Sequence, residues 1–270
     1  MNKYTELFIS IIFLLTVSST VFAGELVIKG STTVLPIAQK AAEAYMAEHP
    51  DVKISLSGGG SGNGIKAIID GTANIGNASR FIKQKEVNLA GTKGVYPVPF
   101  RIALDAIVPV VNKNNAVTDV TLTQLKDIYL GKIKDWKEVS GTPGKIVVIS
   151  RDSSSGTFGV WKDLVMKKER VIPSALTVPS NGGIVQAVAN TPGAIGYVGL
   201  GYLSDGIKAV KVDGIAGSEE STLNGSFPIS RGLFMFTKGW PTGDIMGFLS
   251  FILSKKGQDL VKEAGSIPLF

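Results

Sequence analysis

The stretch that decides the fold is ELVIKGSTTVLPIAQ, residues 25–39, in which a short apolar strand runs into a polar loop and a helix opens at Pro36. The apolar residues beyond the proline keep helical spacing: Ile37, Ala41, Ala44 and Tyr45. The same unit recurs at 52–69, where an alternating strand leads into the glycine-rich loop 57–64. After this loop one helical face carries Ile65, Ile68 and Ile69.

Two further strand ends follow, at 73–80 and at 145–150. The second leads into the polar loop 151–157 and then into a helical stripe formed by Phe158, Trp161, Leu164 and Val165. Strands that alternate with helices predict an α/β fold with largely parallel sheets, in which ligands collect outside the carboxyl ends of the strands. The polar loops at those ends are therefore the expected binding positions.

Two long apolar stretches, 95–111 and 226–237, contain proline and glycine, which exclude a simple helix. They are either adjacent inner strands of one sheet or two crossovers between lobes. The second interpretation predicts two α/β lobes joined by two extended hinge strands, with lobe 1 formed by 24–103 plus 230–270 and lobe 2 by 104–229. A closing helix is expected near the end of the chain from the spacing of Ile245, Phe248, Leu249, Ile252 and Leu253.

The composition excludes several classes of site. The 270-residue chain contains no cysteine, so disulfide frameworks, thiol nucleophiles and cysteine-ligated metal centres are excluded. Its single histidine, His49, lies in a polar turn, and one imidazole cannot build a histidine-rich metal site. The net charge of +6 is spread along the sequence, which gives no indication of nucleic-acid binding. We expect no cofactor and no metal.

The first 23 residues are expected to form a secretory signal peptide that is removed after Ala23. Lys3 precedes an apolar run at 7–15, and small residues precede the cleavage site. Polar residues at 18–20 interrupt the segment before it reaches the roughly 20 apolar residues that a membrane span requires. The sequence thus predicts an exported, periplasmic protein, with no cysteine for a lipid anchor.

Three polar loops have the makeup of an oxyanion site. Backbone amides at a helix N-terminus favour negative charge, and the loops 30–33, 57–64 and 151–157 add serine and threonine hydroxyls as donors. Arg151 adds a guanidinium fork that matches two oxygens of a tetrahedral anion. Taken singly, each loop is typical of an ordinary N-cap. Their recurrence in both expected lobes favours anion binding.

The glycine-rich loop 57–64 does not match the sequence motifs of three common enzyme classes. Counted from Gly59, the Walker A pattern needs a lysine where Ile65 stands. The nucleophile elbow around Ser61 fails at Asn63, which also occupies the third glycine position of a dinucleotide fingerprint. A catalytic serine with a lysine as its general base is still compatible with the sequence, so a secreted hydrolase is kept as an alternative.

Four motifs stand out in order along the chain: GSTTVLP at 30–36, GSGNGIK at 60–66, IGNASR at 75–80, and Arg151 with SGT at 155–157. Together with the segments 122–136, 194–198 and 228–231, they resemble the motif set of the phosphate-binding proteins of phosphate-specific ABC transporters. The resemblance covers essentially the whole chain after the signal peptide. It implies a type II periplasmic-binding-protein fold, phosphate held between two lobes, delivery to a membrane-embedded ABC permease, and no catalytic activity.

By that resemblance, the phosphate ligands would be Thr32, Thr33, Ser61, Ser79, Arg80, Arg151, Ser155, Gly156 and Thr157. One departure concerns the third strand, which in some family members ends with an aspartate that accepts the proton of phosphate, whereas this chain has Ser79-Arg80. Asp152, beside Arg151, is then the candidate acceptor. A receptor for another oxyanion, such as sulfate or molybdate, is the alternative, and a monomer is expected.

Overall fold

One mixed β-sheet runs through the protein, whose computed structural model describes residues 25–140 and 143–270. Its nine strands are β1 (Leu26–Gly30), β2 (Ile54–Ser57), β3 (Ile75–Ala78), β4 (Val98–Asn112), β6 (Val147–Arg151), β7 (Leu176–Val178), β8 (Ala194–Gly199), β9 (Ile207–Ala209) and β11 (Ser230–Thr237). Their order is β2-β1-β3-β11-β4-β8-β6-β7, with β9 also paired to β4. Two short strands, β5 (Asp119–Val120) and β10 (Lys211–Val212), pair separately. The expected signal peptide, 1–23, lies outside the described residues.

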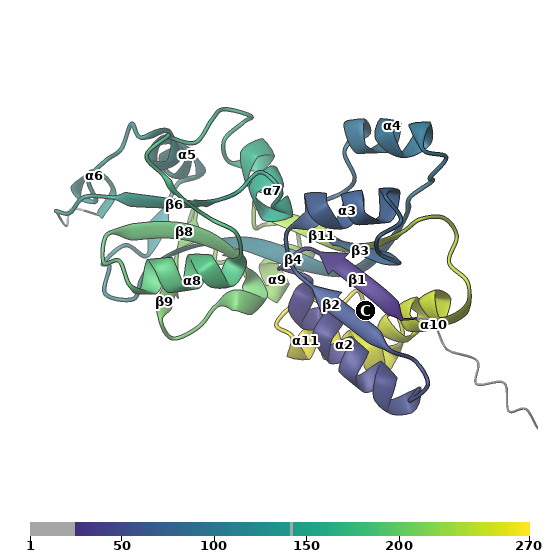
Figure 1. Ribbon diagram of the computed structural model, residues 1–270. Coiled ribbons are helices and arrows are strands. Elements are labelled where there is room, and N and C mark those ends of the chain that lie inside the picture. The colour runs from purple at the N-terminus through teal and green to yellow at the C-terminus, as the bar shows by residue number, and fades with distance from the viewer. Residues whose placement is uncertain (1–24, 141–142) are drawn as a thin grey trace, which may run out of the picture.

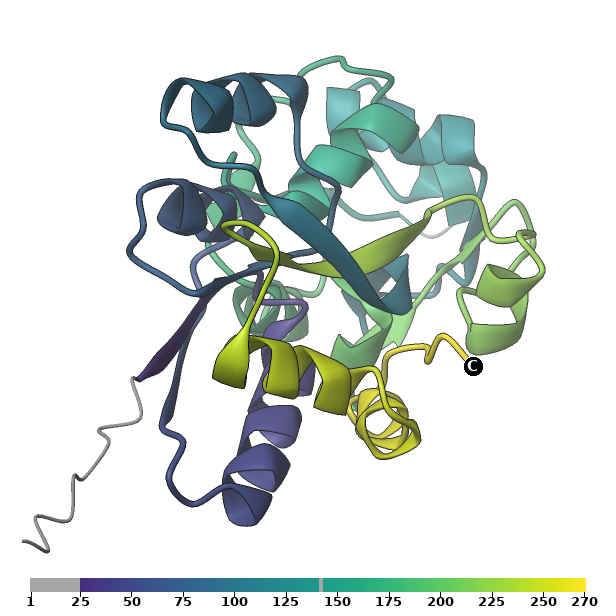
Figure 2. The same ribbon diagram turned by 90° about the vertical axis from the view of Figure 1, so that its right-hand side faces the viewer.

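Helices cover both faces of this sheet, as Figures 1 and 2 show. They are α2 (Leu35–Glu48), α3 (Ser61–Ile69), α4 (Gln84–Thr92), α5 (Leu122–Leu130), α6 (Lys137–Ser140), α7 (Gly156–Leu164), α8 (Asn181–Ala189), α9 (Glu219–Leu223), α10 (Gly243–Ile252) and α11 (Lys255–Glu263), with a short 3-10 turn, η1 (Leu200–Tyr202). In Figure 1, α3 and α4 lie on one side of β1, β2 and β3, whereas α2, α10 and α11 lie on the other. None of the helices in the described ranges is both long and apolar enough to cross a bilayer.

The α/β class expected from the sequence is confirmed, with parallel pairing between β1 and β2, β1 and β3, β6 and β7, and β6 and β8. The expectation of a largely parallel sheet is wrong, because β11 pairs antiparallel with β3 and β4, and β4 pairs antiparallel with β8 and β9. The helix predicted from Pro36 is α2, which places this proline in its first turn. His49 directly follows that helix and is exposed, as the polar turn predicted. The closing helix expected near the end of the chain is α10.

The loop expected at 57–64 is shorter than predicted, because α3 already begins at Ser61. Gly60 precedes it with φ of 96°, a backbone conformation that favours glycine. Gly64 lies inside the helix, where a Cβ would come within 2.6 Å of the Lys29 carbonyl oxygen. The glycine-rich sequence therefore lets the first turn of α3 pack directly against β1.

The two long apolar stretches are adjacent antiparallel strands, β4 and β11, which pair from Val98 with Thr237 to Ala106 with Ser230. β4 has 15 residues, and its second part pairs with β8 and β9 instead. A single strand thus passes from one half of the sheet into the other.

Buried apolar side chains form three clusters. Two of them contain only residues from 26–103 and 233–261. The third contains only residues from 106–229. The chain therefore passes from one set of clusters to the other inside β4 and returns at the start of β11. These two paired strands connect two separately packed halves.

Candidate anion-binding site

The residues proposed as phosphate ligands meet where the carboxyl ends of β1 and β3 face that of β6. All nine are buried, and they come from both halves of the chain. The hydroxyls of Thr33 and Thr157 are 3.2 Å apart, and those of Ser61 and Ser79 are 3.3 Å apart. The structure therefore brings together side chains that are up to 124 residues apart in the sequence.

The N-termini of α3 and α7 lie against one another at this point. A Cβ on Gly156 would come within 2.2 Å of the Ser61 hydroxyl and 2.6 Å of the Ser79 hydroxyl. Ser155 caps α7 by accepting a hydrogen bond from the Phe158 amide at 3.1 Å. The Gly62 amide donates to the Ser154 carbonyl at 2.9 Å across the two halves. Two sets of helix N-terminal amides, which favour negative charge, thus flank the same hydroxyls.

Arg151, at the end of β6, has N–H groups left for an anion. Its Nε donates to the Val178 carbonyl at 3.2 Å, and Nη2 donates to the Pro179 carbonyl at 2.9 Å and to the Thr32 hydroxyl at 3.4 Å. Nη1 is buried and has no hydrogen-bond partner among the residues that the structure describes. Burial lowers the pKa of Arg151, which is the cost of holding a cation in this place. An anion against Nη1 would relieve that cost.

The backbone of Arg151 is supported by Tyr197, whose phenol oxygen accepts from the Arg151 amide at 3.2 Å. Burial raises the pKa of Tyr197 to about 12, so this phenol is neutral and adds no charge to the site. Its ring stacks on Trp161 of α7, with ring centres 4.1 Å apart. Tyr197 of β8 therefore connects the end of β6, through its phenol oxygen, to the middle of α7, through its ring.

Arg80 lies beside the site, but its fork is directed at Glu86 of α4. Nη1 and Nη2 donate to the two carboxylate oxygens at 2.8 and 2.7 Å. Burial raises the pKa of Glu86, but the hydrogen bonds from Arg80 and from the Lys83 amide outweigh it, so that this pKa is lowered overall. The Arg80 charge is balanced before any anion arrives. Its Nε is buried and has no partner in the described part of the chain.

Asp152 takes part in the turn before α7. Its Oδ1 accepts hydrogen bonds from the amide, at 2.8 Å, and from the hydroxyl of Ser154. Among the described residues it forms no ion pair with Arg151. Its role as acceptor of a phosphate proton stays a prediction.

Sequence reasoning missed three polar residues that contact the site. Asn181, the first residue of α8, donates from Nδ2 to the hydroxyls of Thr32 and Thr33 at 3.3 and 2.9 Å. Arg231 of β11 donates to the hydroxyls of Thr33 and Thr157 at 3.3 and 2.9 Å. Asp105 of β4 is fully buried and is ion-paired with Arg231 at 2.6 Å.

A signal for each was present in the sequence. Asn181 opens a polar, glycine-rich helix start like the other three loops, and Asp105 is a carboxylate inside an apolar strand. Arg231 is the last residue of the segment 228–231, which was used above only as part of the family resemblance. Adjacent strands at 95–111 and 226–237 were one of the two interpretations of the sequence, but their register, which brings Asp105 opposite Arg231, was not specified by it.

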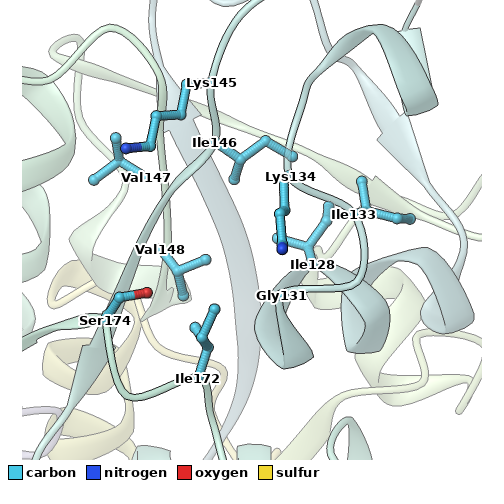
Figure 3. A pocket seen from close by; sticks show the side chains of 10 residues that line it. All are labelled: Ile128, Gly131, Ile133, Lys134, Lys145, Ile146, Val147, Val148, Ile172 and Ser174. Carbon is cyan, nitrogen blue, oxygen red and sulfur yellow. The ribbon is translucent and has the colours of Figure 1, made fainter.

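A pocket on another part of the protein differs in character from the hydroxyl cluster. A pocket of about 340 Å³ beside β6 is lined mainly by aliphatic side chains, with Lys134 and Lys145 among them (Figure 3). It contains none of the residues proposed as phosphate ligands. An apolar pocket offers a small oxyanion few donors, so the buried hydroxyl cluster is the better anion site.

Comparison with known proteins agrees with this geometry. Residues 17–256 match the model of the PBP superfamily domain. The phosphate-binding protein PstS of Bacillus subtilis is 33% identical over 249 residues, which cover 92% of this chain and 81% of that protein. PstS of Pseudomonas aeruginosa is 31% identical over 270 residues, covering 92% and 84%.

Solved structures show the same relationship. A phosphate ABC transporter substrate-binding protein from Clostridium perfringens, solved with bound phosphate, superposes with a TM-score of 0.86 at 38% identity, covering 92% of this chain and all of that one. An ABC-type phosphate transport receptor from Vibrio cholerae superposes with a TM-score of 0.73 at 30% identity, covering 90% and 99%. The type II periplasmic-binding-protein fold expected from the sequence is thereby confirmed, and the chain belongs to the PBP superfamily, within its family of PstS phosphate-binding proteins.

Proposed function

We propose that this protein captures inorganic phosphate between its two halves and delivers it to a membrane-embedded ABC permease for import. The observation that carries the proposal is the buried Nη1 of Arg151, which has no partner within 25–140 and 143–270 and lies among inward-facing hydroxyls and two helix N-termini. Donors at these positions match the oxygens of a tetrahedral oxyanion. Membership of the PstS family favours phosphate among such anions.

The two halves would act as lobes, 24–103 plus 230–270 and 104–229, with β4 and β11 as hinge strands. The separation of the apolar clusters between Ala103 and Ala106 supports this division. Thr32, Thr33, Ser61 and Ser79 would contribute ligands from lobe 1. Lobe 2 would contribute Arg151, Ser155, Gly156 and Thr157.

Arg80 would have a weaker part in binding, because Glu86 already balances its charge at 2.7 Å. We propose further that residues 1–23 export the protein to the periplasm, that it works as a monomer, and that it has no catalytic activity. The family consists of substrate-binding transport proteins, which supports the last of these points.

The test is calorimetry of phosphate-stripped protein against phosphate, sulfate and molybdate at one pH. Phosphate should bind with 1:1 stoichiometry and far more tightly than the other two. Tighter sulfate or molybdate binding would assign the protein to another oxyanion. Turnover of a chromogenic phosphate ester by the purified protein would instead support the hydrolase alternative. Light scattering of the purified chain at working concentration checks the monomer.

A further inference from the structure

The hydroxyl of Thr33 has its direction fixed by its neighbours. Its oxygen accepts from Arg231 Nη2 at 3.3 Å and from Asn181 Nδ2 at 2.9 Å. Arginine can only donate. The side-chain amide of Asn181 is oriented with Nδ2 toward Thr33, because its Oδ1 accepts from the Gly199 backbone amide at 3.4 Å. A hydroxyl has two lone pairs, so Thr33 has none left and must donate its own proton.

The hydroxyl of Thr157 continues this directed chain. It accepts from Arg231 Nη1 at 2.9 Å, and it lies 3.2 Å from the Thr33 hydroxyl, which has to be the donor of that pair. Both lone pairs of Thr157 are then occupied. Its own proton has no acceptor among the described residues, although the side chain is only 1% exposed.

Thr32 is in the same situation. Its hydroxyl oxygen has three donors nearby. Arg151 Nη2 lies at 3.4 Å, the backbone nitrogen of Asn181 at 3.4 Å and the side-chain Nδ2 of Asn181 at 3.3 Å. The Thr32 proton also lacks an acceptor in the described part of the chain. Two buried hydroxyl protons are thus directed at a position that an anion oxygen would satisfy.

Arg231 itself has no N–H group left for an anion. Its five donors are taken by Asp105 at 2.9 Å from Nε and 2.6 Å from Nη2, by the hydroxyls of Thr33 and Thr157, and by the Ser79 carbonyl at 3.2 Å. Asp105 faces Arg231 directly across the β4–β11 pair, and its second oxygen accepts from the Leu200 amide at 2.9 Å. The ion pair holds Arg231 in place, whereas Arg151 keeps a free Nη1.

We propose that Asn181 and Arg231 are positioning residues that force Thr32, Thr33 and Thr157 to act as hydrogen-bond donors, with Asp105 holding Arg231. This inference rests on the proposed function. One wall of the site then offers donors only and can face only unprotonated oxygens of phosphate. The proton of the anion has to face another side, where Ser61 and Ser79 share a hydrogen bond whose direction is not fixed by such neighbours.

Asn181→Leu tests the proposal, with Asn112→Leu as the matched control. Asn112 is also buried, and it donates to the Val188 and Ala189 carbonyls at the far end of the same helix, α8. Both variants are titrated with inorganic phosphate by calorimetry from pH 5 to 8.5, and Tm is measured without ligand. We expect Asn181→Leu to lose about tenfold or more in phosphate affinity relative to Asn112→Leu. Its pH profile should also shift toward acid, because Thr33, released from Asn181 Nδ2, can then accept from the Thr157 hydroxyl. The Thr157 oxygen thereby gains a lone pair that can accept a hydrogen bond from the proton of monobasic phosphate.

Equal affinities in the two variants, or an Asn181→Leu profile parallel to that of the wild type, would overturn the proposal. If Asn181→Leu does not fold, Arg231→Lys decides the question, because it keeps the charge beside Asp105 but cannot reach both threonines. It should lose at least tenfold in affinity, and unchanged affinity would contradict the inference. A wild-type protein that binds no phosphate would defeat the proposed function instead, so the two failures are distinguishable.

Discussion

Arg151 and Arg231 are both buried arginines at the site, yet their hydrogen bonds assign them different tasks. Arg231 has all its donors satisfied within the protein, whereas Arg151 keeps Nη1 for a ligand. Removing a charged partner of a buried anion typically costs about 2–5 kcal/mol. We therefore expect Arg151→Met to weaken phosphate binding by roughly 30-fold or more.

Calorimetry against phosphate measures this loss, and Arg170→Met is the control, since Arg170 is an exposed arginine of the same half. Arg151 also donates to the Val178 and Pro179 carbonyls, so the variant should melt at a lower temperature. Affinity close to that of Arg170→Met would show that another group carries the anion.

At the residue scale the sequence predicted the side chains that lie in local motifs. Thr32 and Ser61 lie in the loop or helix start after a strand, and Arg151 is the last residue of one, so position along the chain was enough to place them near the carboxyl ends of the strands. Asp105 and Arg231 could not be found this way. Their pairing depends on the register between two strands that are more than a hundred residues apart, and no local pattern specifies that register.

At the scale of elements, the N-terminus of α7 approaches α3 so closely that only glycine fits at position 156. In Gly156→Ala the new methyl group would meet the Ser61 and Ser79 hydroxyls at 2.2 and 2.6 Å. We expect this variant to lose phosphate affinity by tenfold or more, about 1.4 kcal/mol, because the halves cannot close on the ligand. Gly91→Ala in α4 is the control, since outside the adjacent residues and the backbone of α4 itself no atom of the described residues lies within 4 Å of the new methyl group.

A second element, α4, is attached to the end of β3 through the Arg80–Glu86 pair. Because the folded-state pKa of Glu86 is lowered, the pair contributes stability above the ordinary carboxyl pKa of about 4, and this contribution is lost as the pH falls through the folded value. Urea unfolding between pH 3 and 7 should therefore show a steeper acid loss for the wild type than for Glu86→Gln. If the free energy of unfolding depends on pH in the same way in both proteins, the Arg80–Glu86 pair does not contribute to stability between pH 3 and 7.

The sequence predicted which helices and strands exist better than it predicted the residues at which they begin. The strand, loop and helix units at β1–α2 and β6–α7 follow from hydrophobic periodicity and the opening proline or serine. The start of α3 was misplaced, because glycines that read as loop residues are needed inside the helix for close packing on β1. Tertiary contact overrode the local preference there.

At the scale of the whole molecule, two separately packed halves are connected through the β4–β11 pair, and they also touch directly at the site. The Ser154 hydroxyl donates to the Gly59 carbonyl at 3.0 Å, and its carbonyl accepts from the Gly62 amide at 2.9 Å. Further polar contacts between the halves join Thr32 and Thr33 to Arg151, Thr157 and Asn181. Such polar contacts can separate without exposing the apolar clusters of either half, because β4 and β11 stay paired. A hinge motion about these strands is the expected consequence.

Small-angle scattering tests that motion. A ligand that contacts both halves favours the closed arrangement by its difference in affinity for the closed and open states. The phosphate-free protein should therefore have a larger radius of gyration than the phosphate-saturated one. Arg151→Met at the same phosphate concentration serves as the control and should keep the larger value. An unchanged wild-type profile, with binding confirmed by calorimetry on the same sample, would mean that phosphate enters a rigid molecule and that β4 and β11 are not hinges.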